Sequence, residues 1–195
     1  MASERLDVLV VGGGAREHAL VRTLAKSARI GRLIGAPGNP GIEDDAVTVA
    51  MDSEDITSIV AFAEREKIDL IVVGPEAPLV AGLAEQLRDR GFAVFGPGAA
   101  GARLEGSKAF AKEVMDAAGV PTGRAATFSD YDEALAYLRT HGAPVVVKAD
   151  GLAAGKGVIV SRTLEEAEEA LRECFVERRF GNAARLHRQH PHSQV

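Results

Sequence analysis

The 195-residue sequence has a single cysteine, no long apolar run and no excess of positive charge. Cys174 cannot form an internal disulfide, and its apolar helical position favours a small buried side chain over a nucleophile. No apolar run reaches the roughly 20 residues of a membrane span, and no apolar signal segment precedes the first predicted strand. A net charge of −5 argues against general nucleic-acid binding. We therefore expect a cytoplasmic protein that binds neither nucleic acid nor membranes.

Short β-branched runs alternate with amphipathic helices in the first part of the chain. The runs at 8–11 and 70–73 are continuously apolar and predict strands buried on both faces, and 93–95 predicts a further strand. A polar cap at Ser53 precedes a helical apolar stripe made of Ile56, Ile59, Val60 and Ala63. Another helix is predicted at 79–90, ended by a left-handed Gly91. This α/β pattern predicts a Rossmann-like parallel sheet with ligand loops at the carboxyl ends of its strands.

A second region begins where the repeating pattern stops, after a helix that starts at Ser107. We expect an N-terminal substrate-binding domain at 1–120 and a second, incomplete domain at 121–183. The second domain is predicted to contain a helix at 130–140, two strands flanking a glycine-rich loop at 145–148 and 158–161, and a helix capped by Thr163 and Glu166. Residues 184–195 lack apolar periodicity and predict a disordered tail, whose His187, His190 and His192 are more typical of a solvated tract than of a metal site.

The glycine loop at 12–14 follows a strand and opens a helix, an arrangement in which backbone N–H groups can hold a phosphate. A dinucleotide is the alternative ligand, but Glu17 stands where that fingerprint needs its third glycine, and the ribose-binding acid is missing. A compact phosphorylated ligand, with Arg16 as an extra cation, fits better. A tight turn that needs glycine for packing alone remains the structural alternative.

Charged residues mark two further loops. Glu76 follows the 70–73 strand and lies at the same sheet edge as the glycine loop, so it can bind an amine or ribose hydroxyls, or it can simply favour the next helix N-terminus. The loop at 150–157 lacks the spacing and hydroxyl of a Walker A motif and leads into a strand, which indicates a flap over phosphates. Lys148 at its start favours a phosphate role, because burying an ammonium without a partner is costly. Lys108 opposes the helix dipole unless an anion is present.

Five strings resemble the phosphoribosylamine–glycine ligase family, also called glycinamide ribonucleotide synthetase, over residues 8–182: VGGGAREH (11–18), APGN (36–39), VGPEAPL (73–79), LEGSKAF (104–110) and VKADGLAAGKGV (147–158). The resemblance implies an ATP-grasp ligase of purine biosynthesis, with a pre-ATP-grasp domain followed by the first ATP-grasp lobe. It implies a reaction of ATP, glycine and phosphoribosylamine through a glycyl phosphate, with magnesium or manganese as the metal of the full-length enzyme. Separately, we expect a monomer. The implied substrate site is Gly12, Gly13, Gly14, Arg16, Glu17, Asn39 and Glu76. The implied ATP site is Lys108, Lys148, Asp150, Gly151, Gly155, Lys156 and Gly157.

The sequence departs from this family after residue 183. The family continues into a second ATP-grasp half that carries its magnesium ligands, whereas this chain continues into the arginine- and histidine-rich 184–195 segment. We therefore expect no metal site and no catalytic residue in this chain, and no activity of the chain alone. Two other functions stay open: a non-catalytic phosphate- or nucleotide-binding module, and an ATP-grasp enzyme with another carboxylate substrate, which the 11–18 and 73–79 strings disfavour.

Overall fold

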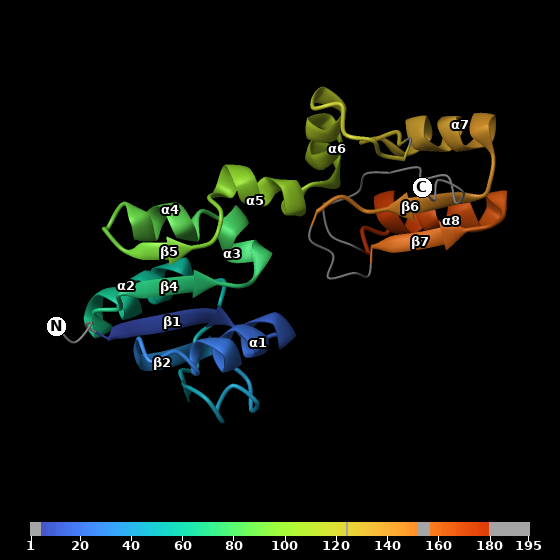
Figure 1. The fold of residues 1–195 in the computed structure, drawn as a ribbon. Helices are drawn as coiled ribbons and strands as arrows, with labels where there is room; N and C mark the ends of the chain where they lie inside the picture. Colours follow the sequence, from blue (N-terminus) through green and yellow to red (C-terminus); the bar gives the residue numbers. More distant parts are fainter. Residues whose placement is uncertain (1–4, 124, 152–156, 180–195) are drawn as a thin grey trace. The chain divides into compact units, whose positions relative to one another are not determined.

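The computed structural model describes residues 5–123, 125–151 and 157–179. They form two compact units, Met1–Ala102 and Arg103–Val195 (Figure 1). The boundary predicted at residue 120 lies later in the chain and stays a prediction. The predicted 184–195 tail, with its histidines, lies outside the described residues. Among the described residues, no helix is long and apolar enough to cross a membrane.

The first unit is built on a five-stranded parallel sheet in the order β3-β2-β1-β4-β5. Its strands are β1 (Leu6–Gly12), β2 (Ile30–Pro37), β3 (Val47–Thr48), β4 (Leu70–Val73) and β5 (Ala93–Phe95). Its helices are α1 (Ala15–Leu24), α2 (Ile56–Glu66), α3 (Glu76–Val80) and α4 (Leu83–Arg88), and α5 (Ala99–Gly106) follows β5. The direction of strand progression reverses between β1 and β4, which makes the carboxyl ends of these two strands the topological switch point.

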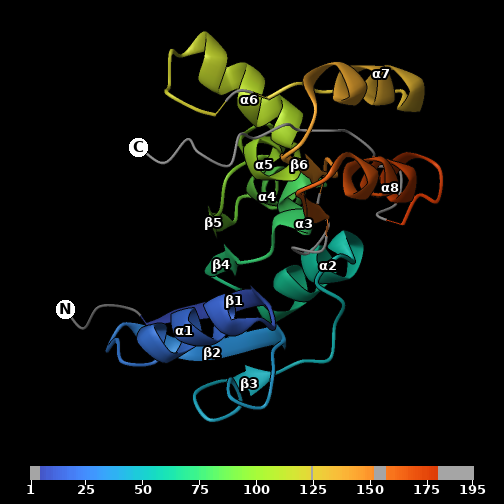
Figure 2. The ribbon, with the colours of Figure 1, turned by 90° about the vertical axis from the view of Figure 1, so that its right-hand side faces the viewer.

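Strand β1 is buried on both faces, as its continuous apolar run predicts. Leu9 and Val11 pack in one core cluster with side chains of α2 and α4. Val8 and Val10 pack in a second cluster with Val21 of α1. Successive residues of a strand point to opposite faces, so the single run 8–11 serves both layers. Figure 2 shows the sheet with its helices from a second direction.

Two local predictions about the first unit are wrong. The helix expected at 79–90 is two short helices, because Gly82 adopts a left-handed backbone (φ +90°) and interrupts the hydrogen-bond ladder between α3 and α4. The cap of α2 is Asp55 rather than Ser53: the Asp55 side chain accepts a hydrogen bond from the Ser58 N–H at 3.0 Å. Gly91 is left-handed as predicted (φ +88°).

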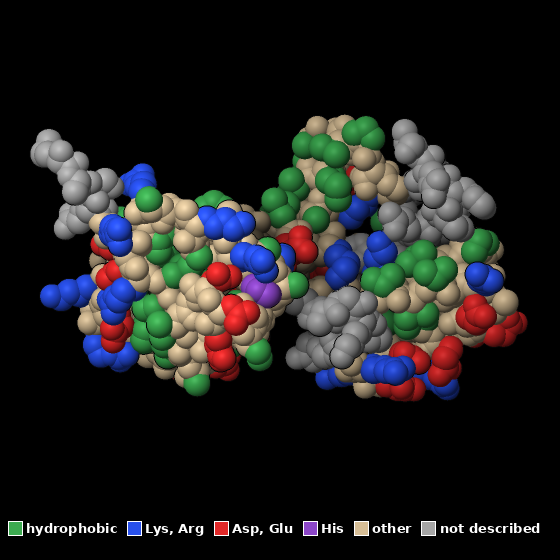
Figure 3. Space-filling view, turned by 60° about the horizontal axis from the view of Figure 1, so that its bottom comes forward, with side chains coloured by type: hydrophobic (Ala, Val, Ile, Leu, Met, Phe, Trp, Pro, Cys, Tyr) green, Lys and Arg blue, Asp and Glu red, His purple; other side chains and the backbone are tan. Residues whose placement is uncertain are grey.

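The second unit packs two helices on a two-stranded antiparallel sheet. Its strands are β6 (Val145–Lys148) and β7 (Val158–Ser161), and its helices are α6 (Lys108–Ala117), α7 (Tyr131–His141) and α8 (Leu164–Phe175). Side chains of α7, α8 and one sheet face form a common core. The predicted capping box is present, since Thr163 Oγ1 accepts from the Glu166 N–H at 3.2 Å and the Glu166 carboxylate accepts from the Thr163 N–H. On the face drawn in Figure 3, basic and acidic side chains of the described residues are interspersed.

Cys174 lies on the inner face of α8 with 2% of its surface exposed, as predicted. Burial, with a smaller contribution from the Glu173 charge, raises the pKa of its thiol to about 11. We expect Ellman's reagent at pH 8 to label the folded chain at least about 100-fold more slowly than the urea-unfolded chain, because about one thiol in a thousand is then ionised. Labelling rates are read from the released thionitrobenzoate. Equal rates would contradict a buried thiol.

Candidate functional site

The glycine loop between β1 and α1 lies at the switch point and is held by close backbone contacts. A Cβ built on Gly13 would lie 2.4 Å from the carbonyl oxygen of Gly38, so only glycine fits there. Asn39 donates from Nδ2 to the Gly13 carbonyl at 2.8 Å, and the Gly38 N–H donates to the Gly12 carbonyl at 3.3 Å. The loop after β2 therefore braces the glycine loop. Asn39, a predicted substrate residue, contributes to this brace.

Glu17 is buried beneath the same loop, with 3% of its surface exposed. Its Oε2 accepts a hydrogen bond from the Gly14 N–H at 2.6 Å. Its Oε1 has no hydrogen-bond partner among the described residues and lies 4.0 Å from Nε of Arg16. The side chain fills the space against Gly12 and Gly74, where a Cβ on either glycine would overlap it. A carboxylate thus occupies the place in which a dinucleotide fingerprint needs its third glycine.

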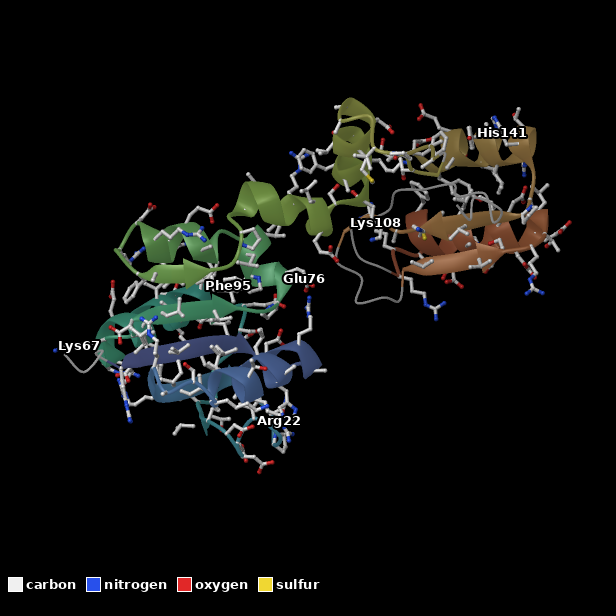
Figure 4. All side chains as sticks on the ribbon, in the orientation of Figure 1. Arg22, Lys67, Glu76, Phe95, Lys108 and His141 are labelled. Carbon is white, nitrogen blue, oxygen red and sulfur yellow. The ribbon has the colours of Figure 1, made fainter. Side chains whose placement is uncertain are left out.

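Arg16 and Glu76 join the two loops of the switch point. Nη1 of Arg16 lies 2.6 Å from Oε1 of Glu76, and the hydrogen bond to Arg16 is the main reason that the pKa of Glu76 is lowered. The Arg16 side chain is 65% exposed, so a ligand can reach it. Glu76 begins α3 at the end of β4, where Figure 4 labels it. Both predictions for Glu76, a binding residue or a favourable charge in the first turn of a helix, agree with this position.

The second candidate site is a cluster of three lysines in the second unit, Lys108, Lys112 and Lys148. Burial first, and then the charges of Lys108 and Lys112, lower the pKa of Lys148, which ends β6 and is partly buried. Lys112 donates to Oγ1 of Thr122 at 3.0 Å. Lys112 is not among the site residues predicted from the sequence. Its spacing of four residues from Lys108 puts both ammonium groups on one face of α6, and this signal could have identified it.

The loop after β6 starts within this cluster. Lys108 donates from Nζ to the Gly151 carbonyl at 2.9 Å, and Asp150 accepts hydrogen bonds from Ala109 N–H at 3.1 Å and from Ser107 Oγ at 3.0 Å. The Ala149 N–H donates to the Gly157 carbonyl at 2.8 Å, which joins the two ends of the loop. The structure thus brings Lys108, Lys148, Asp150, Gly151 and Gly157 together. The predicted ATP residues Gly155 and Lys156 lie outside the described residues.

Comparisons with known proteins match both units. The model of the phosphoribosylglycinamide synthetase N domain matches residues 6–105, and the model of the ATP-grasp (A) domain of that synthetase matches residues 106–186. A phosphoribosylamine–glycine ligase of Agrobacterium fabrum is 51% identical over 178 residues, which are 91% of this chain and 42% of that protein. The crystal structure of the Thermotoga maritima phosphoribosylamine–glycine ligase has a TM-score of 0.74 at 28% identity, covering 94% of this chain and 43% of that one.

A more distant structure extends the comparison to nucleotide-bound proteins. The biotin carboxylase domain of the Hydrogenobacter thermophilus 2-oxoglutarate carboxylase, solved with magnesium ADP, has a TM-score of 0.74 at 25% identity. It covers 94% of this chain, which corresponds to 44% of that chain.

The fold and the matched domains define an α/β protein of the ATP-grasp class, with an N-terminal parallel-sheet domain before the first ATP-grasp lobe. The chain belongs to the phosphoribosylglycinamide synthetase family, as the resemblance of its five strings predicts. It spans 42% of the length of the Agrobacterium fabrum relative. The two family domains meet between residues 105 and 106, close to the division between the compact units.

Proposed function

We propose that this chain supplies the sugar-phosphate site and part of the ATP site of a phosphoribosylamine–glycine ligase in purine biosynthesis. In the proposed reaction ATP phosphorylates the glycine carboxylate, and the amine of 5-phosphoribosylamine attacks the glycyl phosphate to give glycinamide ribonucleotide, ADP and phosphate. One observation carries the proposal: Lys108 donates from Nζ to the Gly151 carbonyl at 2.9 Å, just after the end of β6, and its charge and that of Lys112 act on the partly buried Lys148 that ends this strand. Three like charges repel one another, and a polyphosphate that binds among them relieves this repulsion.

The sugar-phosphate part of the proposal rests on the switch point of the first unit. The Gly14 N–H is engaged by Glu17, so the proposal assigns the phosphate to neighbouring N–H groups at the start of α1 and to Arg16. Glu76 is the proposed acceptor for the sugar amine or a ribose hydroxyl. Glu17 and Asn39 are both predicted to bind substrate, and both form hydrogen bonds with the backbone of the glycine loop. In the proposal they therefore contribute to binding by fixing the shape of this loop.

Magnesium, or manganese in its place, is the metal expected with ATP, and it would neutralise charge on the transferred phosphoryl group. Among residues 5–123, 125–151 and 157–179, no group of three His, Cys, Asp or Glu side chains is placed to hold a metal ion. The carboxylate oxygens of Asp150 accept hydrogen bonds from Ser107 and Ala109. The described residues therefore do not fit a magnesium site, and the proposal gives them binding and positioning roles alone.

The second candidate function is a non-catalytic nucleotide-binding module. Such a module would bind ligands at the same two sites but would take no part in the ligase reaction. A glycine-dependent ADP assay, run with phosphoribosylamine on the purified chain, should show no ADP above a control without protein, because we expect no activity of the chain alone. ADP above that control would exclude the non-catalytic module. The proposed working unit in either case is a cytoplasmic monomer that binds small molecules.

Titration of isotopically labelled chain tests where each ligand binds. ATP should shift the amide signals of Ala109 and Gly151, and glycinamide ribonucleotide should shift those of Gly13 and Glu76. Shifts from glycinamide ribonucleotide near Gly151 alone would show that the sugar-phosphate site is misplaced. Absence of any ATP-dependent shift near the lysine cluster would refute the ATP site.

Replacement of Arg16 by alanine is expected to weaken glycinamide ribonucleotide binding by at least about tenfold, because a charge-assisted contact contributes roughly 1.5 to 3 kcal/mol. The matched control is Arg22→Ala, which removes an exposed arginine from the last turn of the same helix (Figure 4). Calorimetric titration gives both dissociation constants. An equal loss in the two variants would assign the effect to overall charge rather than to a contact by Arg16.

A further inference from the structure

The Asp150 side chain is buried within the second unit instead of extending into solvent, where it could contact a nucleotide. Asp150 is 8% exposed. One of its carboxylate oxygens accepts a hydrogen bond from the Ala109 N–H at 3.1 Å, and the other accepts from Ser107 Oγ at 3.0 Å. Both donors belong to the start of α6, more than 40 positions earlier in the sequence. The carboxylate thus joins two segments of the second unit that are far apart in the chain.

We propose that Asp150 is a positioning residue: it fastens the end of β6 to the first turn of α6 and thereby places Lys108 and Lys148 for binding a polyphosphate. The effect on nucleotide affinity rests on the ATP site proposed above. The role differs from the direct ATP contact implied by the family resemblance, since Asp150 would act on the nucleotide only through other side chains.

The electrostatics of α6 favour an anion at its N-terminus. The first residue of the helix is Lys108, and a positive side chain there opposes the partial positive charge of the helix N-terminus. The Asp150 carboxylate supplies a negative charge at this end from within the chain. Ser107 adds a second link, because its hydroxyl donates to Asp150 and accepts from the Phe110 N–H at 3.2 Å.

Further contacts connect this carboxylate to the lysines. Residue 151 follows Asp150 directly, and its carbonyl accepts the hydrogen bond from Nζ of Lys108 at 2.9 Å. Gly151 has a left-handed backbone (φ +92°), which favours glycine at this turn. Lys148 ends the strand two residues before Asp150, and its pKa is lowered partly by the charge of Lys108. Fixing the end of β6 on α6 therefore fixes the separation of two ammonium groups.

The test compares Asp150→Ala with a matched loss of another helix cap in the same unit. Asp130 caps α7, a helix that carries none of the three lysines of the cluster, by accepting from the Glu133 N–H at 3.0 Å. Calorimetric titration with ATP should give five- to tenfold weaker binding for Asp150→Ala and binding within twofold of the original chain for Asp130→Ala. Equal losses in both variants would mean that Asp150 acts through general stability, and the proposal would fail.

A double-mutant cycle tests whether Asp150 acts together with Ser107. Ser107→Ala should show part of the loss seen in Asp150→Ala, and the double variant should bind ATP no more weakly than Asp150→Ala alone. If the two losses multiply, Asp150 contributes to ATP binding independently of Ser107, and the part of the proposal that links Asp150 to the lysines through the Ser107 hydroxyl fails.

Hydrogen exchange provides a measurement that does not depend on ATP. The Ala109 amide should exchange at least about tenfold faster in Asp150→Ala, because its hydrogen-bond acceptor is removed. Unchanged exchange would overturn the proposed link. If the original chain binds no ATP while the exchange rate rises as expected, the proposed ATP site fails and the link between β6 and α6 stands.

Discussion

The variant Gly74→Ala is expected to be destabilised by roughly 2 to 3 kcal/mol, because an added methyl group would overpack a closed site. A Cβ at Gly74 would lie 2.1 Å from Oε1 and 2.5 Å from Cγ of Glu17. Glu17 has little room to move, since it is 3% exposed and its other carboxylate oxygen holds the Gly14 N–H. The methyl group must therefore displace either the buried carboxylate or the strand end.

Urea unfolding followed by circular dichroism measures this change, since the chain has no tryptophan to serve as a fluorescent probe. The control is the double variant Gly74→Ala with Glu17→Ala, in which the overlapping side chain is gone. We expect the double variant to be no less stable than Glu17→Ala alone. A stability of Gly74→Ala within about 0.5 kcal/mol of the original chain would show that the site is not closed.

The parts of the fold that the sequence predicts are those with strong local patterns. The run 8–11 is wholly apolar because both faces of β1 are covered, and the stripe of α2 reflects its single buried face. Strand β2 was not predicted: Gly31, Arg32 and Gly35 weaken its local pattern, and its place in the sheet depends on pairing with β1. Strand β3 has two residues, too few to show any period.

In the candidate sites too, the sequence predicts local features but not contacts between distant segments. The glycine loop and Glu76 could be assigned to one sheet edge from sequence, because parallel strands place their carboxyl ends together. The sequence could not show that Arg16 meets Glu76, because this contact depends on the packing of β1 against β4. The contact between Ser107 and Asp150 is likewise long-range, and no local spacing predicts it. The contact of Glu17 with the Gly14 N–H spans only three residues, and a glutamate at the third position of the helix is a local signal that could have predicted it.

Replacement of Lys148 by methionine is expected to change stability and binding in opposite directions. Burial, and then the charges of Lys108 and Lys112, lower the pKa of Lys148 from 10.5. The charged ammonium is therefore less favourable in the folded chain than in the unfolded chain. Its cost to stability is complete below the lowered pKa and disappears as the pH rises through 10.5. At pH 7 the variant should have a higher melting temperature than the original chain.

The same variant should bind ATP roughly 10- to 100-fold more weakly, because a charge-assisted contact to phosphate contributes roughly 1.5 to 3 kcal/mol. Arg162→Met is the matched control, since it removes an exposed positive charge from the same unit. Melting is followed by circular dichroism and binding by calorimetry, both at pH 7. The gain in stability should be largely lost near pH 11, where the lysine is mostly neutral in both states. A variant that loses ATP affinity and also melts at a lower temperature would indicate that Lys148 stabilises the fold. The proposed role of Lys148 in binding phosphate would then be wrong.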